Sequence, residues 1–207
     1  MRTGADGLPS SPASDAAFPL ELREALARRE PAALARFFDA HFERVYAYLR
    51  RLVGDEHLAE DLTQDVFLQA HRALPSYDPA RDPRPWLFTI ATNRLRDHWR
   101  SRAAQTASAV TSLDQEELVE RIEGAPAASA ATLDQAELAG RVRAAIDALP
   151  GGLRATVLLR VYEGLSFEDI GRILERNEAA ARKRYSRALT ALRAELGELW
   201  KQAEGAR

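Results

Sequence analysis

Apolar residues recur every three or four positions along most of the chain from Leu20 onward, the spacing of an amphipathic helix. No stretch of useful length alternates with the period of two that a half-buried strand requires. The longest periodic run covers residues 31–53 and is expected to bury Leu34, Phe37, Phe38, Phe42, Val45, Tyr46 and Leu49. We therefore predict an all-α fold.

Capping and helix-breaking residues divide this pattern into separate helices. Pro31 suits the first position of a helix, Gly54 suits the end of one, and Asp55 can cap the next. The segment 75–85 contains four prolines and is predicted to be a loop, because proline cannot continue a helix. The predicted helices are 20–30, 31–53, 55–74, 85–102, 134–149, 153–162, 166–174 and 177–200.

The loss of periodicity after Arg102 predicts two domains. Residues 1–17 are rich in Ser, Pro, Ala and Gly and are expected to form a disordered tail. We predict a helical domain at 18–103, an acidic and Ala/Ser-rich flexible linker at 104–132, and a second small helical domain at 133–207.

The helix at 85–102 has two contrasting faces. One face gathers Leu87, Ile90, Ala91, Leu95 and His98 for a core; the other gathers Trp86, Thr89, Asn93, Arg96 and Arg100. An amide can read a base edge and guanidinium groups can bind phosphate, so this second face fits a nucleic acid. A solvated helix face with a half-buried tryptophan explains the same pattern.

The last two predicted helices have a helix-turn-helix outline. Ser166 and Asp169 form a capping box for a short helix, and Asn177 caps a longer one. The first turns of the longer helix would carry the contacts if it entered a major groove. They hold a basic cluster made of Arg182, Lys183, Arg184 and Arg187. A basic helix that faces only solvent is the alternative.

Composition limits the possible functions. The net charge is −2, 46% of residues are hydrophobic and 29% are charged, and there is no cysteine, which excludes disulfides and thiolate metal sites. We find no secretion signal and no apolar run of transmembrane length, so we expect a cytoplasmic protein. The four histidines are not spaced as metal ligands, and no catalytic motif appears, so we expect no enzyme activity, no metal and no cofactor.

Several segments in a fixed order resemble the sigma-70 family of bacterial transcription initiation factors, in particular its extracytoplasmic-function (group IV) class. EDLTQDVFLQAHRAL (60–74) and WLFTIATNRLRDHWR (86–100) resemble successive parts of region 2 of that family. ALPGGLRATVLLRVYEGLSFEDIGRIL (148–174) and ARKRYSRALTALR (181–193) resemble region 4 with its helix-turn-helix. The resemblance covers most of the chain after Leu34.

The resemblance implies a factor that binds core RNA polymerase, directs it to promoters and helps to open the −10 region. Contacts to the clamp helices of the largest polymerase subunit would come from Asp61, Gln64, Asp65 and Phe67. The −10 element would be read by Asn93, Arg96 and Arg100, with Tyr77 and Trp86 as candidates for holding a flipped base. The −35 element would be bound by Arg182, Lys183, Arg184 and Arg187. Region 4 would also meet the β flap, and an anti-sigma factor is an expected partner.

The chain departs from the family at the helix-turn-helix turn. The family usually has glycine there and a Thr-Val pair opening the recognition helix, whereas this chain has Glu175 and then Ala180 and Ala181. A glutamate at positive φ costs about 1 kcal/mol. The alternative functions are an autonomous helix-turn-helix regulator and a helical adaptor that binds only protein.

Overall fold

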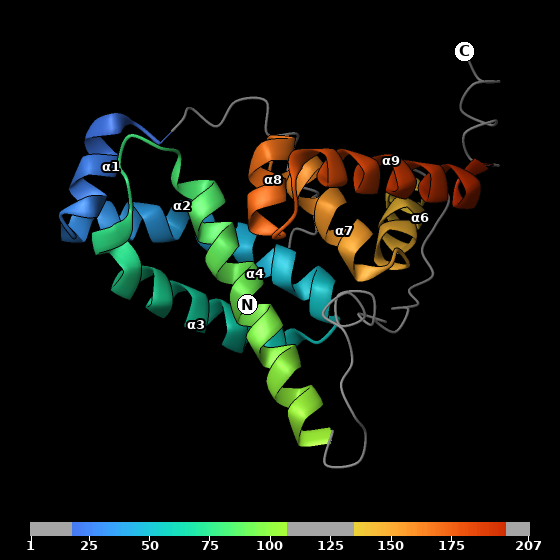
Figure 1. Cartoon of the computed structure of the whole chain (residues 1–207), viewed down its shortest axis with the longest axis horizontal. Helices are drawn as coiled ribbons and strands as arrows, with labels where there is room; N and C mark the ends of the chain where they lie inside the picture. The colour runs from blue at the N-terminus through green and yellow to red at the C-terminus, as the bar shows by residue number, and fades with distance from the viewer. Residues whose placement is uncertain (1–17, 107–134, 198–207) are drawn as a thin grey trace.

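The computed structural model describes residues 18–106 and 135–197, and all of the helices and turns named here lie within these two ranges (Figure 1). The first range contains α1 (Leu20–Ala27), α2 (Pro31–Val53), α3 (Glu56–Ala73), the 3₁₀ turn η1 (Leu74–Ser76) and α4 (Pro83–Thr106). The second contains α6 (Gln135–Asp147), α7 (Gly151–Val157), the π-helical turn η2 (Leu158–Tyr162), α8 (Phe167–Ile173) and α9 (Glu178–Glu195). The described residues contain no strand, which confirms the all-α prediction. The predicted tail, nearly all of the predicted linker and the last residues of the chain lie outside the described ranges.

The predicted caps form as the sequence indicated. Gly54 ends α2 in the left-handed region at φ 75°, and the Asp55 carboxylate accepts a hydrogen bond from the Leu58 amide at 3.0 Å. The Ser166 hydroxyl accepts one from the Asp169 amide at 3.0 Å, and the Asn177 side chain accepts one from the Ala180 amide at 2.8 Å. Side-chain acceptors thus satisfy amides that the first turn of each helix leaves unpaired.

Two predicted helix starts were wrong. Helix α4 begins at Pro83 rather than Pro85, because a proline in the first turn lacks only an N–H that would have no helical partner. Asp82 caps this start by accepting from the Arg84 amide at 2.9 Å. Helix α7 begins at Gly151, directly after Pro150, rather than at Leu153.

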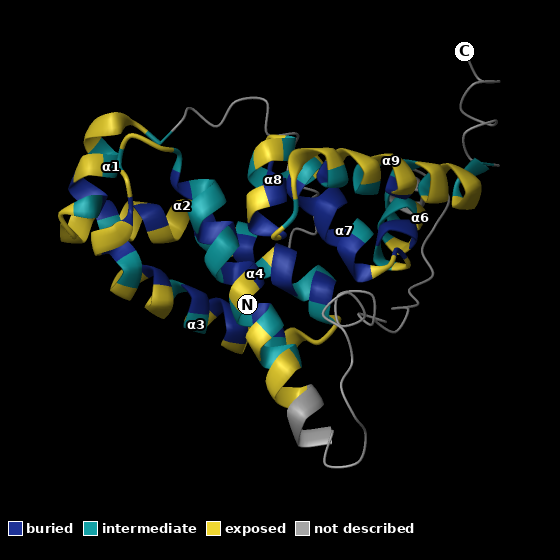
Figure 2. Cartoon of the chain, viewed as in Figure 1, coloured by how far each residue is buried: buried dark blue, intermediate teal, exposed yellow. Residues whose placement is uncertain are grey.

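In the first domain, α4 packs against α2 and α3. Leu87, Phe88, Ala91 and Leu95 are buried along α4, while Ile90 and His98, which we expected in the core, are only partly buried (Figure 2). Phe38 of α2 was also expected in the core, but 44% of it is exposed. The apolar arc of α2 is wider than the surface that α3 and α4 cover, so Phe38 is left on its edge.

The second domain is built around α8 and α9, which pack against each other, with α7 packed against α9. Ile170 and Ile173 of α8 and Ala181 and Ala188 of α9 are buried between them. Glu175, in the turn, has φ 54°. The Glu175 amide donates a hydrogen bond to the Arg172 carbonyl, and the Arg176 amide donates one to the Gly171 carbonyl. Glu175 therefore holds the position that glycine usually takes at a helix end.

The two domains are in contact, and their buried side chains form one continuous cluster. Helix α8 lies against α4, and α7 lies against α2 (Figure 1). None of the described helices combines the length and the apolar character needed to cross a membrane.

Candidate nucleic-acid interface

Asn93, Arg96 and Arg100 share one side of α4, as their spacing of three and four residues requires. Asn93 and Arg100 are exposed, and Arg96 is partly buried. The Arg96 guanidinium donates to the Asn93 side-chain oxygen at 2.9 Å, and Arg100 forms an ion pair with Asp97 at 3.5 Å. The structure therefore brings the three residues predicted for the −10 element together on one surface.

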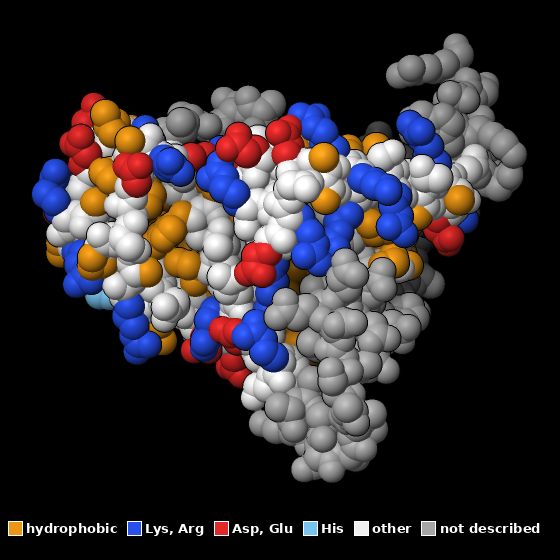
Figure 3. All heavy atoms as spheres, viewed as in Figure 1, with side chains coloured by type: hydrophobic (Ala, Val, Ile, Leu, Met, Phe, Trp, Pro, Cys, Tyr) orange, Lys and Arg blue, Asp and Glu red, His pale blue; other side chains and the backbone are white. Residues whose placement is uncertain are grey.

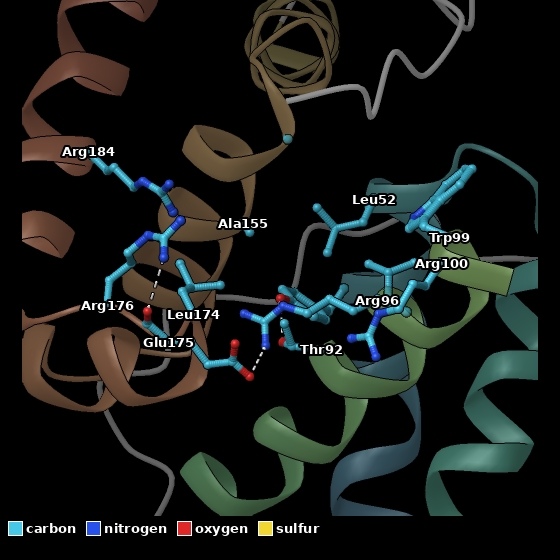
Figure 4. Close-up of a pocket in the computed structure, with 13 residues that line it drawn as sticks. Leu52, Thr92, Arg96, Trp99, Arg100, Ala155, Leu174, Glu175, Arg176 and Arg184 are labelled. Carbon is cyan, nitrogen blue, oxygen red and sulfur yellow. Dashed lines mark hydrogen bonds and ion pairs between the residues drawn. The ribbon is translucent and has the colours of Figure 1, made fainter. Parts of the chain in front are cut away.

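Arg96 also reaches the second domain. Its guanidinium donates to the Glu175 carboxylate at 2.8 Å and to the Ile173 carbonyl at 3.2 Å. Figure 4 shows this pair at the border of a pocket between the two domains, with Arg100 and Trp99 on the α4 side and Arg176 and Arg184 on the other. No local pattern in the sequence predicts this contact, because the two residues lie 79 positions apart, on either side of the predicted linker.

Tyr77 and Trp86 pack against each other beneath the proline-rich loop, with ring centroids 5.1 Å apart. Tyr77 is only 6% exposed, its hydroxyl donates to the Arg81 carbonyl at 2.7 Å, and burial raises its pKa to about 12. Trp86 also contacts Phe37 of α2, at a centroid distance of 6.4 Å. Both rings therefore help to hold the loop on the start of α4.

A hollow of about 860 Å³ lies between this loop and α8. Tyr77, Trp86 and Thr89 line it from the first domain, and Ser166 and Arg172 line it from the second. The two rings predicted to hold a base therefore border an open volume despite their packing.

The basic cluster of α9 lies largely on the surface. Arg182, Lys183 and Arg187 are exposed, while Arg184 is partly buried at the interdomain pocket. Figure 3 shows Lys and Arg side chains gathered over α9. Arg182 bonds to the Glu178 carboxylate at 3.0 Å through Nε and stacks over the Phe167 ring at 4.8 Å, so its guanidinium is held in place on the helix surface.

The residues predicted to bind polymerase lie along α3. Asp61 and Gln64 are exposed, and Asp65 forms an ion pair with Arg94 of α4. Phe67 is partly buried and contacts Phe38, at a centroid distance of 5.0 Å.

Next to them the structure shows an apolar surface that sequence periodicity did not identify. Phe38 is 44% exposed and Leu68 is 57% exposed. An apolar hollow of about 290 Å³ adjoins them, lined by Leu34, Phe38, Phe67 and Leu74 among others. The exposed fractions of Phe38 and Leu68 reveal this surface, and they are known only once the fold is known.

Histidine and carboxylate side chains do not cluster into a metal site in the part of the chain that the structure describes. No three His, Asp or Glu side chains there could hold a metal ion. His41 is buried, its Nδ1 lies 2.8 Å from the Phe37 carbonyl, and burial lowers its pKa. His41 is a core residue.

Comparison with protein families gives two matches in chain order. The model of sigma-70 region 2 matches residues 37–105, and the model of sigma-70 region 4 matches residues 139–192. The first match contains nearly all of α4, with Asn93, Arg96 and Arg100, and the second contains α8, the turn after it and α9 as far as Leu192.

Curated relatives and solved structures agree with these matches. The RNA polymerase sigma factor CarQ of Myxococcus xanthus is 37% identical over 163 residues, which cover 78% of this chain and 88% of CarQ. The extracytoplasmic-function sigma factor SigE of Mycolicibacterium smegmatis is 34% identical over 74% of this chain, which spans only 57% of the length of SigE.

Among solved structures, CnrH in complex with the cytosolic domain of CnrY is 25% identical, with a TM-score of 0.60 over 86% of this chain and 97% of that one. The sigma factor RpoE of Bartonella quintana, solved with the anti-sigma factor NepR, is 23% identical with a TM-score of 0.62, over 79% of this chain and 96% of that one, and shares the fold.

Proposed function

The chain belongs to the extracytoplasmic-function class of the sigma-70 family, and we propose that it binds core RNA polymerase, directs it to two-part promoters and helps to open the −10 region. The observation that supports this most is the placement of two DNA-competent surfaces on separate domains. One is the Asn93 side of α4, and the other is the basic start of α9.

On α4, we assign base reading to Asn93 and backbone binding to Arg96 and Arg100. An amide offers a donor and an acceptor to a base edge, whereas guanidinium groups fit phosphate oxygens whatever the sequence. Tyr77 and Trp86 support this surface by fixing the loop, and the hollow beside them has room for an unstacked base.

On α9, Arg182, Lys183, Arg184 and Arg187 bind the −35 element as duplex. The exposed members supply charge to phosphates from the N-terminal half of the recognition helix, the usual place for such contacts. Ala180 and Ala181 offer no hydroxyl there, so phosphate contacts at the very start of the helix come from backbone amides.

Core polymerase docks on α3 through Asp61, Gln64, Asp65 and Phe67. The carboxylates suit a basic partner surface, and the exposed rims of Phe38 and Leu68 add an apolar contact. An inhibitory protein partner is also expected, because solved relatives are complexed with CnrY and with an anti-sigma factor. We place the protein in the cytoplasm, where polymerase acts.

Run-off transcription with purified core polymerase, with and without the chain, tests the proposal. We expect product only when both are present, across a library of templates with varied −10 and −35 sequences. If the chain neither binds core polymerase nor supports initiation on any template, this result contradicts the proposal. An autonomous regulator would instead bind duplex DNA tightly without core.

Two substitutions separate reading from positioning on α4. Asn93→Ala should change the ranking of −10 sequences in the library, whereas Arg100→Ala should lower output on all of them by a similar factor. Arg36→Ala, which removes an exposed guanidinium on α2, is the matched control and should change neither. If Asn93→Ala only scales every output equally, the reading role of Asn93 is wrong.

A further inference from the structure

The contact between Arg96 and Glu175 engages the groups that the proposed function assigns to the −10 element. Arg96 donates to Glu175, to Asn93 and to the Ile173 carbonyl, and its side chain is only 18% exposed. The Asn93 acceptor is occupied by the same guanidinium. In this arrangement two guanidinium nitrogens of Arg96 are bonded to protein acceptors, and the Asn93 side-chain oxygen already accepts one hydrogen bond.

The charges around the contact favour a carboxylate at position 175. Four arginines line the pocket between the domains: Arg96, Arg100, Arg176 and Arg184. Among the described residues that line this pocket, Glu175 alone is acidic. Closing the domains gathers guanidinium groups from both sides, and the Glu175 carboxylate opposes their mutual repulsion (Figure 4).

The backbone holds Glu175 in this position at a cost. It sits at φ 54°, in the left-handed region that glycine adopts more easily, and its own turn does not need a carboxylate. The Glu175 side chain is 66% exposed and contacts Arg96 across the domain boundary. A strained residue whose side chain bonds to the other domain indicates a role between the domains rather than within the turn.

A second carboxylate supports the same closed arrangement. Glu163, which is buried, accepts from Arg44 Nε at 2.9 Å, and its carbonyl accepts from Arg84 at 3.2 Å. Both arginines belong to the first domain. Region 4 therefore presents two glutamates to arginines of region 2, one in the buried part of the contact and one at the −10 surface.

We propose that Glu175 is an interdomain latch: it closes region 4 over the −10 surface of region 2, so that the free chain is held from promoter DNA until Arg96 exchanges the carboxylate for phosphate. That this surface reads the −10 element rests on the proposed function, whereas the latch itself rests on the observed contacts. An exposed carboxylate paired with a partly buried arginine stabilises the closed form by about two- to fivefold in the closed-to-open ratio.

Single-molecule energy transfer in the free chain tests the latch without polymerase or DNA. The sequence has no cysteine, so His57→Cys on α3 and Ser186→Cys on α9, both exposed, accept the two dyes without competing sites. Glu175→Arg should lower the closed-to-open ratio more than about fivefold, because it adds a like charge to the four arginines. Arg96→Glu combined with Glu175→Arg should restore the ratio to within about twofold.

One control removes a carboxylate elsewhere on the domain, and a second variant removes the charge of Glu175 while keeping a side chain of the same size at that position. Glu195→Gln removes an exposed carboxylate from the same domain and should leave the ratio unchanged. If circular dichroism shows that Glu175→Arg does not fold, Glu175→Gln keeps the size and backbone of the turn and should give a loss of about two- to fivefold. Unchanged energy transfer in the folded Glu175 variants, or no recovery in the charge swap, overturns the latch. Absence of run-off product overturns the proposed function and leaves the energy-transfer result standing.

Discussion

Replacing the buried Arg154 by methionine should destabilise the chain more than replacing an exposed arginine such as Arg100 or Arg141. Arg154 is 2% exposed, and its guanidinium donates to the Leu149 carbonyl at 3.0 and 3.2 Å and to the Arg51 carbonyl at 2.9 Å. Leu149 belongs to the same domain, whereas Arg51 is in the other. One buried cation therefore satisfies backbone groups on both sides of the domain contact.

The size of the effect follows from these bonds. Methionine fills similar space but donates nothing, so two carbonyls lose their donors, at about 1–3 kcal/mol each. Part of this is offset, because the folded chain no longer has to desolvate a guanidinium, an effect that already lowers the pKa of Arg154. We expect a net loss of about 2–4 kcal/mol in the free energy of unfolding.

Urea unfolding followed by circular dichroism measures this loss, with the slope of the transition checked for a two-state process. Arg141→Met is the matched control, since Arg141 is exposed on α6 and its loss should change stability by less than about 0.5 kcal/mol. A loss below about 1 kcal/mol for Arg154→Met would refute the reasoning, because the two carbonyls would then need no donor.

Two further predictions concern the first domain. Burial lowers the pKa of His41, so the unfolded chain binds a proton at pH values at which the folded chain does not. The free energy of unfolding should therefore be at its full value above about pH 6.5 and fall as the pH drops below it. Urea midpoints at pH 7.5 and 5.5 should fall less in His41→Gln than in the native chain or in the exposed control His57→Gln; an equal fall in all three would contradict this. Phe38→Ser should weaken binding to core polymerase about tenfold, measured by fluorescence anisotropy, with little loss of stability. By contrast, Phe37→Ala, at a buried neighbour, should cost about 3–5 kcal/mol in stability, and unchanged core affinity in Phe38→Ser would exclude that ring from the interface.

Features set by neighbouring residues could be predicted from the sequence. Asp55, Ser166 and Asn177 cap helices because their acceptors reach amides three residues ahead, whatever the rest of the chain does. The positive φ of Glu175 was also predictable, since the helix-turn-helix turn needs it. The order of the segments along the chain matches the family and predicted the function, whereas no single helix face could have predicted it.

Features set by distant segments could not be predicted in this way. The exposure of Phe38 depends on how much of α2 the other helices cover, and periodicity does not report that. The packing of Tyr77 under the loop depends on where Trp86 and Arg81 lie in space. Arg96 meets Glu175 across 79 positions of sequence, with no local pattern at either end that anticipates the partner.

The left-handed conformation of Glu175 also bears on how such a contact can arise in a lineage. Glycine codons GGA and GGG become the glutamate codons GAA and GAG by one base change. The turn tolerates either residue, because the hydrogen bond that shapes it joins the backbone carbonyl of Gly171 to the backbone amide of Arg176 and needs no side chain at position 175. A charged tether between the two domains is therefore one mutational step from the glycine usual in the family, and it can be gained or lost without rebuilding the DNA-binding helix.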